Sequence, residues 1–121
     1  MSVPDEHLED VMQLYRGGLS AAGLEHVIFG HVGNNHLHVN ILPNDLAELA
    51  RGKALYLEWA GKTVAMGGSI SAEHGIGKTK VPLLEKMFGA DGIAAMRRIK
   101  AYFDPGGILN PGNLFTMEKN Q

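Results

Sequence analysis

The sequence predicts an α+β fold, an antiparallel sheet with helices on one face, and three observations carry this prediction. Apolar residues recur at helical spacing in several segments of the chain. Two short runs, HVIFGHV and HLHVNIL, have the composition and alternation of strands. The pair Asn34-Asn35 between them suits a tight turn, because Asn tolerates the left-handed backbone conformation. We therefore expect one hairpin packed against helices.

The composition is that of a globular protein. The chain has 121 residues, 45% of them hydrophobic, and a formal net charge of −2, which fits one compact soluble domain over residues 1–121. The balanced charge argues against nucleic acid and anionic membrane surfaces as partners, and no apolar run approaches the roughly 20 residues of a membrane span. The absence of cysteine excludes disulfides and thiolate ligands and fits a reducing compartment. We expect a cytoplasmic protein without a signal peptide.

The first helix is expected over residues 5–20, and a second, longer helix begins near residue 45. Asp45 followed by Glu48 has the spacing of a capping box. The inward residues expected for the first helix are Leu8, Val11, Met12, Tyr15 and Leu19. Those expected for the second are Leu46, Leu49, Ala50, Leu57 and Val64. Trp59 also lies on the second helix and fits either the core or an interface.

Two further helices are expected after the glycine-rich loop GGSISAEHGIGKTK. Pro82 suits the first turn of a short helix that ends at Gly89. Asp91 is the expected N-cap of the last helix. The inward residues expected there are Ile93, Met96, Ile99 and Phe103. The following stretch, DPGGILNPGNLF, can form only turns and extended chain.

The hairpin register decides where the histidines point. A two-residue turn at positions 34 and 35 places His31 opposite His38. Side chains alternate between the two faces of a strand, so polar and apolar residues separate. The polar face contains His31, His36, His38 and Asn40, and the apolar face contains Leu37, Val39 and Ile41. Two strands alone make a poor sheet, so either a further strand lies in an irregular segment or partner strands lie outside this chain.

The polar face allows two interpretations. Directly opposed residues have Cβ atoms about 4.5–5.5 Å apart, so His31 and His38 can aim at one cation. The alternative is a solvated face that happens to be rich in histidine. The remaining histidines, His7 and His26, lie outside this cluster and are expected at the surface.

A second cluster, SAEHGIG, places Glu73 and His74 among glycines, which let a backbone approach a ligand closely. Two histidines and one carboxylate with an open position have the composition of a catalytic zinc site, although other divalent metals accept the same ligands. His74 is the candidate acid–base group, since imidazole titrates near neutrality. The alternative is a flexible loop with a surface Glu-His pair. Lys78 and Lys80 suit either an anionic ligand or solvent.

Three motifs, HVGNNHLHVN, GGSISAEHGIGKTK and DPGGILNPGNLF, occur in this order within residues 25 to 116. Together they resemble the C-terminal domain of FAD-linked oxidases, the group of the glycolate oxidase D-subunit and of D-lactate and D-2-hydroxyglutarate dehydrogenases. Wider relatives are the vanillyl-alcohol oxidase type flavoproteins. The resemblance implies part of a ferredoxin-like substrate domain whose sheet extends beyond this chain. It also implies that a 2-hydroxy acid such as glycolate or D-lactate is oxidised to a 2-oxo acid, with FAD as hydride acceptor.

The resemblance also implies roles for individual residues. His31, His38 and Glu73 match the family's metal ligands, and zinc is the first choice among divalent metals. His74 matches the catalytic base that takes the hydroxyl proton. Two further matches are Asn40, which would contact substrate, and Asn110 in LNPG, which would close the flavin side of the site.

The chain departs from the family pattern His-x-Gly-Asp-Gly-Asn-Leu-His at three positions. Asn34 stands where Asp is usual, Asn35 where Gly is usual, and His36 where Asn is usual. Loss of the acid removes a negative charge beside the expected ligands, and His36 is able to compete as a ligand. Ala72 in place of the common Gly is a smaller change. The identity of the metal stays open for these reasons.

The implied activity needs partners that the sequence does not supply. The chain has no stretch suited to cradling the phosphates of FAD, and in the family an FAD-binding domain precedes this region. We therefore expect a fragment or truncated protein that is inactive alone and meets FAD through that domain. Two other classes stay open, a stand-alone metal-dependent hydrolase and a non-catalytic module that dimerises through its open sheet edge. Attachment to the membrane periphery through an electron-acceptor complex is an alternative to a purely cytoplasmic location.

Overall fold

The computed structural model describes residues 1–115. The chain divides into two compact units, Met1–Ala72 and Glu73–Gln121. Both strands lie in the first unit, whereas the second contains the helix α3 and loops. Within the described residues, no helix combines the length and the apolar character that a membrane span requires.

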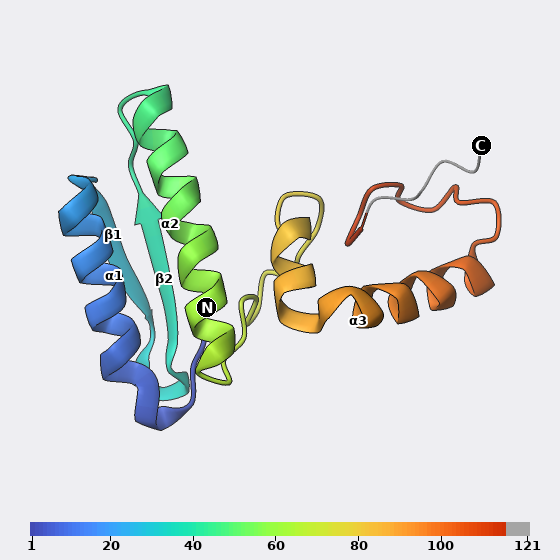
Figure 1. The fold of residues 1–121 in the computed structure, drawn as a ribbon, viewed down its shortest axis with the longest axis horizontal. Helices are drawn as coiled ribbons and strands as arrows, with labels where there is room; N and C mark the ends of the chain where they lie inside the picture. Colours follow the sequence, from blue (N-terminus) through green and yellow to red (C-terminus); the bar gives the residue numbers. More distant parts are fainter. Residues whose placement is uncertain (116–121) are drawn as a thin grey trace. The chain divides into compact units, whose positions relative to one another are not determined.

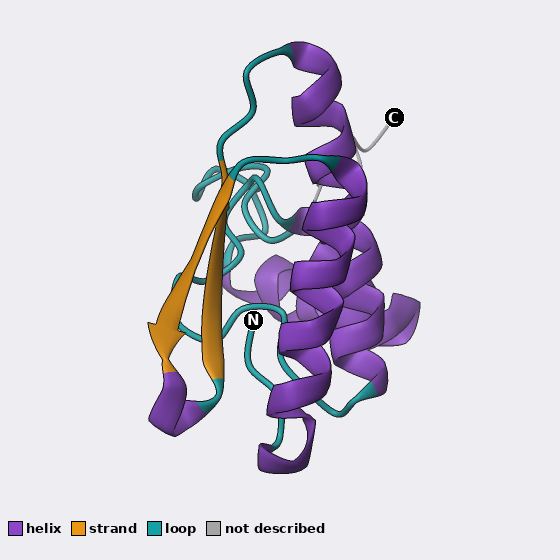
Figure 2. Ribbon diagram, turned by 90° about the vertical axis from the view of Figure 1, so that its left-hand side faces the viewer, coloured by secondary structure: helices purple, strands orange, loops and turns teal. Residues whose placement is uncertain are grey.

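The first unit has the element order that the sequence predicted (Figure 1). Its elements are η1 (Asp5–His7), α1 (Leu8–Ala22), β1 (His26–His31), η2 (Val32–Asn34), β2 (His36–Ile41) and α2 (Leu46–Ala65). The strands pair antiparallel, which confirms the α+β class. Helices α1 and α2 run along the same side of the two strands (Figure 2).

The ends of the first unit's helices follow from local chemistry. Gly23 ends α1 in the left-handed conformation, with φ 63°, which glycine adopts without steric cost. Asp45 is the N-cap of α2, and its side chain accepts a 2.7 Å hydrogen bond from the Glu48 N–H. The Glu48 side chain accepts in return from the Asn44 N–H at 2.8 Å. The predicted cap at Asp45 is therefore confirmed, with the return bond shifted by one residue.

The predicted inward stripe of α1 is confirmed, but that of α2 is wrong. Val11, Tyr15 and Leu19 of α1 are buried. The residues of α2 that are buried are instead Gly52, Trp59, Ala60 and Thr63. Leu46, at 83% exposure, lies on the outward side of the helix. At 3.6 residues per turn, its position is roughly a third of a turn away from the centre of this buried face.

Close approach of the backbones explains this face of α2. A Cβ built on Gly52 would lie 3.3 Å from the Ile41 side chain of β2, and one built on Gly18 of α1 would lie 3.2 Å from the Trp59 indole. The rings of Trp59 and Tyr15 are 4.7 Å apart. Small residues let the elements meet and Trp59 fills the space between them, so Trp59 belongs to the core. The predicted face of α2 was based on the spacing of its large aliphatic residues. The face that is buried was missed because its apolar area comes from one Trp and several small residues.

The observed register differs from the predicted one by two residues. His31 pairs with His36, and Phe29 pairs with His38. The connection is η2 followed by Asn35 in the left-handed conformation, which is longer than the two-residue turn expected. A shift of two residues keeps every side chain on its face, because the strand repeat is two. The predicted division into a polar and an apolar face survives, and Leu37 is buried as expected.

A short extended segment supplements the hairpin. Ser2 forms isolated antiparallel bridges with His36 and with Ser69. The Leu37 N–H donates to Met1 O at 3.0 Å, and Ser2 and Ser69 exchange two 2.9 Å hydrogen bonds. These isolated bridges supplement the hairpin, but among the described residues the sheet itself has two strands.

The second unit is built around α3 (Val81–Phe103), which Gly89 interrupts with φ 66° and ψ 175°. This interruption matches the predicted end of one helix and start of the next. The small core of the unit contains Leu84, Ile93 and Phe115, with Ile76 and Met96 packed against it. The prediction of inward Ile99 and Phe103 is wrong, since they are 63% and 76% exposed. The last turn of α3 instead directs Lys100 toward Asp104 and the following loop.

Candidate functional site

Three histidines gather on the polar face of the hairpin. The ring centroids of His36 and His38 are 4.4 Å apart, and those of His31 lie 5.7 Å from His36 and 6.0 Å from His38. Each ring offers a nitrogen, and these nitrogens lie within 4.8 Å of one another. His31 is exposed, His38 is half-buried and His36 is buried. The predicted clustering of imidazoles is present, with His36 as an additional member.

Gly30 fixes the two strands at this place. A Cβ on Gly30 would lie 2.1 Å from the His36 carbonyl oxygen, which is far inside van der Waals contact. The backbone also has φ 156° there, a conformation that favours glycine. Gly30 therefore allows the close approach that sets His31 opposite His36. Sequence reasoning did not single out this glycine, although an isolated glycine within a strand signals close backbone approach.

The corner of the hairpin explains one departure from the family pattern. Asn35 occupies the left-handed region with φ 48°, where glycine is usual and Asn is tolerated. Its N–H donates to Val32 O at 3.0 Å. Its side-chain amide also donates to the Asp5 carboxylate, a contact that glycine cannot make. Asn in place of Gly at position 35 thus keeps the turn and adds a hydrogen bond to the N-terminal segment.

Phe29 lies beside the histidines, and the sequence analysis did not identify it as part of the site. Its ring stacks on His38 with centroids 5.1 Å apart and an interplanar angle of 14°. Its position two residues before His31 places it on the same face, and that spacing was the available signal. Asn40, the predicted substrate residue, is exposed and pairs with Val27 on this face. The candidate site therefore has an aromatic edge beside its polar centre.

Glu73 and His74 lie in the second unit. Glu73 Oε1 is 3.2 Å from His74 Nε2, so the carboxylate can hold and orient the imidazole. Gly75 and Gly77 have positive φ values of 65° and 59° and give this loop turns that other residues resist. The two side chains are 43% and 67% exposed, respectively. The part played by Glu73 beside the hairpin histidines stays a prediction.

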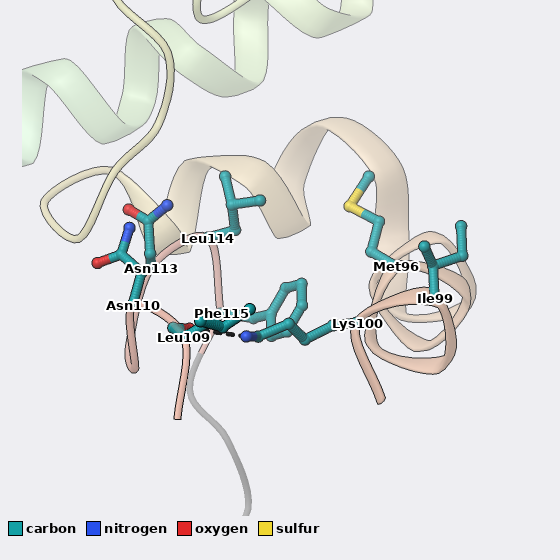
Figure 3. Close-up of a pocket in the computed structure, with 8 residues that line it drawn as sticks. All are labelled: Met96, Ile99, Lys100, Leu109, Asn110, Asn113, Leu114 and Phe115. Atoms are coloured by element: carbon teal, nitrogen blue, oxygen red, sulfur yellow. Dashed lines mark hydrogen bonds between the residues drawn. The ribbon is translucent and has the colours of Figure 1, made fainter. Parts of the chain in front are cut away.

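Asn110, the predicted flavin-side residue, lines a cavity of about 420 Å³ in the second unit. Figure 3 shows Asn110 and Asn113 together at one end of it, with Lys100 and apolar side chains around the rest. Asn110 has φ 44°, a left-handed conformation that Asn tolerates better than most residues. One end of this cavity thus offers amide groups next to a largely apolar lining.

Asp104 organises the loop that carries Asn110, and sequence reasoning did not identify it. Its carboxylate accepts from the Ile108 N–H at 3.1 Å and from the Leu109 N–H at 2.9 Å. The hydrogen bond from Lys100 lowers the pKa of Asp104 most, against the effect of burial, and the two amides add to the lowering. Lys100 also donates to Leu109 O at 2.7 Å (Figure 3). The signal available was the spacing of Lys100 and Asp104 at the end of a helix.

The family of FAD linked oxidases, C-terminal domain, matches residues 1–114. The D-2-hydroxyglutarate dehydrogenase of Stutzerimonas stutzeri is 46% identical over 95 residues, which are 75% of this chain and 20% of that protein.

Two further relatives share the same region. The glycolate oxidase subunit GlcD of Bacillus subtilis is 39% identical over 92 residues, 74% of this chain and 20% of that protein. The mitochondrial D-lactate dehydrogenase [cytochrome] of Arabidopsis thaliana is 32% identical over 114 residues, 93% of this chain and 20% of that protein. The chain spans about a fifth of the length of these relatives. Because the family match covers nearly all of its residues, the chain belongs to the family of FAD-linked oxidases, C-terminal domain.

Proposed function

We propose that this chain is the substrate- and metal-binding part of an FAD-dependent oxidoreductase that converts a 2-hydroxy acid to a 2-oxo acid. The observation that carries the proposal is the gathering of imidazoles on one face of the hairpin, in a member of this family. The substrates in the names of the relatives, glycolate, D-lactate and D-2-hydroxyglutarate, share a hydroxyl group beside a carboxylate. We take that shared unit as the group that the site recognises.

A divalent metal fits the donor set on the hairpin. Imidazole is a common ligand of zinc and of similar divalent metals. Nitrogens of His31 and His38 lie within 4.8 Å of each other, so small rotations of the two side chains would bring both nitrogens to one ion. We propose that these two histidines and Glu73 hold the metal.

Chain connectivity supports a ligand role for Glu73. The backbones of Ser69 and Ser2 are joined by hydrogen bonds, and Ser2 forms an isolated β-bridge with His36. Glu73 follows Ser69 by four residues, a reach of at most about 14 Å for extended chain. The carboxylate has two oxygens, so its contact with His74 does not prevent coordination through the other oxygen.

The residues of the chain divide the remaining work. A bound metal would supply Lewis acidity toward the carboxylate and hydroxyl oxygens of a substrate, and bound FAD would supply the hydride acceptor. His74 takes the hydroxyl proton, and Glu73 keeps its imidazole oriented through the 3.2 Å contact. Asn40 offers an amide to the substrate on the same face as His38, and Asn110 borders the flavin side.

The proposal requires an FAD-binding domain as partner. It also expects the sheet to continue in the ferredoxin-like manner of the family. Among the described residues β1 pairs only with β2, so its outer edge is where further strands or a second copy of the chain would add.

The test uses a flavoprotein in which this chain follows an FAD-binding domain. Glycolate, D-lactate and D-2-hydroxyglutarate are added without oxygen, and the flavin absorbance is followed. We expect at least one of them to bleach the flavin and to yield its 2-oxo acid, whereas 3-hydroxybutyrate leaves the flavin oxidised. A preparation with full FAD and metal content that none of the three acids reduces would contradict the proposed function.

A further inference from the structure

Position 36 carries a histidine where the family pattern has Asn, and this side chain lies inside the imidazole cluster. We infer that His36 is a third imidazole ligand, so that the hairpin alone holds a divalent metal and Glu73 is not required for binding. The presence of a metal in this inference rests on the proposed function. The inference goes beyond the proposed function because it changes which residues are needed to bind the metal.

The strand pairing explains why His36 can serve. His36 is directly opposite His31 in the register and two residues before His38 on the same strand, so all three point to one face. Its ring is nearer to His38, at 4.4 Å, than the ring of His31 is, at 6.0 Å. Its nitrogen is within 4.8 Å of a nitrogen of each of the other two. Small rotations of the side chains would therefore bring His36, as well as His31 and His38, to a cation placed among the three nitrogens.

Burial favours ligation by His36 over exposure to solvent. The residue is 7% exposed, because the strand-like segment at Ser2 lies on its other side. The ring is therefore already largely removed from water, so ligation adds little desolvation cost. Burial also restricts the side chain, so little conformational entropy is lost on binding.

The two ligand sets differ in which unit of the chain supplies the metal ligands. With two histidines and Glu73, the metal draws on both units of the chain. With three histidines, every required ligand comes from paired strands of the first unit. Three imidazoles also favour zinc, cobalt, nickel and copper over magnesium and calcium, which prefer oxygen ligands. The departure at position 36 thus makes the site selective for the first group of metals.

The experiment measures Zn²⁺ affinity of the full 121-residue chain by competition with a chromophoric chelator. We expect Glu73→Ala to keep the affinity within about tenfold of the wild type, a change of about 1.4 kcal/mol. We expect His36→Asn, which restores the family residue, to weaken Zn²⁺ binding more strongly. Loss of an outer-sphere partner of a metal ligand costs about 10–100-fold in affinity, and loss of a ligand should cost at least as much. The double variant should lose binding altogether. His26→Asn is the matched control, because His26 lies on the opposite face of the hairpin.

A spectroscopic readout makes the result independent of affinity. Co²⁺ bound to the wild type should show a visible absorption band whose position changes in His36→Asn and not in His26→Asn. Equal Zn²⁺ affinity and an unchanged Co²⁺ band in His36→Asn would overturn the inference while leaving the proposed metal site intact, as would complete loss of binding in Glu73→Ala. Absence of binding by the folded wild-type chain would overturn both.

Discussion

The hairpin and the glycine-rich loop present their chemistry in different ways. The histidines of the hairpin stand on paired strands, where the register and the two-residue repeat decide the face that each one occupies. Glu73 and His74 stand on a loop with positive φ at Gly75 and Gly77, and their contact with each other defines their geometry. This difference shows that the hairpin holds its imidazoles in places set by strand pairing, whereas the loop leaves Glu73 and His74 substantially exposed.

The largest effect should come from the loop. In a flavoprotein that carries this chain, His74→Ala should lower turnover by about 10²–10⁴-fold, the usual contribution of a positioned general base, with little effect on substrate binding. His38→Ala should raise KM as well, because a metal ligand also serves the ground state. Steady-state kinetics on both variants, after flavin content has been matched, measures this split. Near-normal turnover of His74→Ala would reduce this residue to a structural role.

The next effect should come from the hairpin. Gly30→Ala forces a methyl group against the His36 carbonyl, so it should destabilise the first unit by about 1–3 kcal/mol, as overpacking does, and weaken metal binding. Gly33→Ala is the control, since a Cβ there has no neighbour within 4 Å, and it should change stability by less than about 0.5 kcal/mol. Urea denaturation measures both. Equal stabilities would show that the strands can separate without cost at this point.

Acid should act on the second unit through Asp104. Its lowered pKa means that ionisation stabilises the folded loop above the ordinary value of 3.8, and that this stabilisation is lost as the pH falls through the lower folded value. The amide NMR signals of Ile108 and Leu109, which donate to the carboxylate, should titrate below pH 3.8. Asp104→Asn should abolish that titration. Titration at the ordinary value would mean that Lys100 does not pair with Asp104 in solution.

Alkali should act on the first unit through Tyr15, with no effect near neutrality. Burial raises the pKa of Tyr15 to about 12, partly offset by its hydrogen bond with Thr63. The neutral phenol therefore stabilises the folded state below pH 10, and this stabilisation is lost as the pH rises through about 12. Tyr15→Phe should make the stability of this unit less dependent on pH in that range. Denaturation curves at pH 8 and near pH 11 compare the two proteins.

The parts predicted correctly are those that a local repeat determines. The alternation of residues assigned His31, His36 and His38 to one face even though the turn was wrong, because the error was an even number of residues. The cap at Asp45 and the break at Gly89 also follow from nearby residues alone. Such features need no knowledge of what packs against them.

The parts missed depend on residues distant in the sequence. The inward face of α2 follows from the fit of Trp59 against Tyr15 and Gly18, which no helical repeat contains. The bridges of Ser2 and the role of Asp104 in holding the loop at Leu109 likewise arise only after folding. The sequence likewise placed His36 on the polar face, but the predicted register did not place it opposite His31, where the structure has it.

The central claim is that the hairpin face holds a catalytic metal, and anomalous X-ray diffraction at the zinc edge tests it most directly. Crystals of the chain grown with Zn²⁺ should show one strong peak about 2.0–2.1 Å from ring nitrogens of His31, His36 and His38, and an oxygen of Glu73 that also binds should lie about 2.0–2.2 Å from the zinc. Crystals that contain zinc only at other places, with these imidazoles bonded to water or protein alone, would contradict the claim.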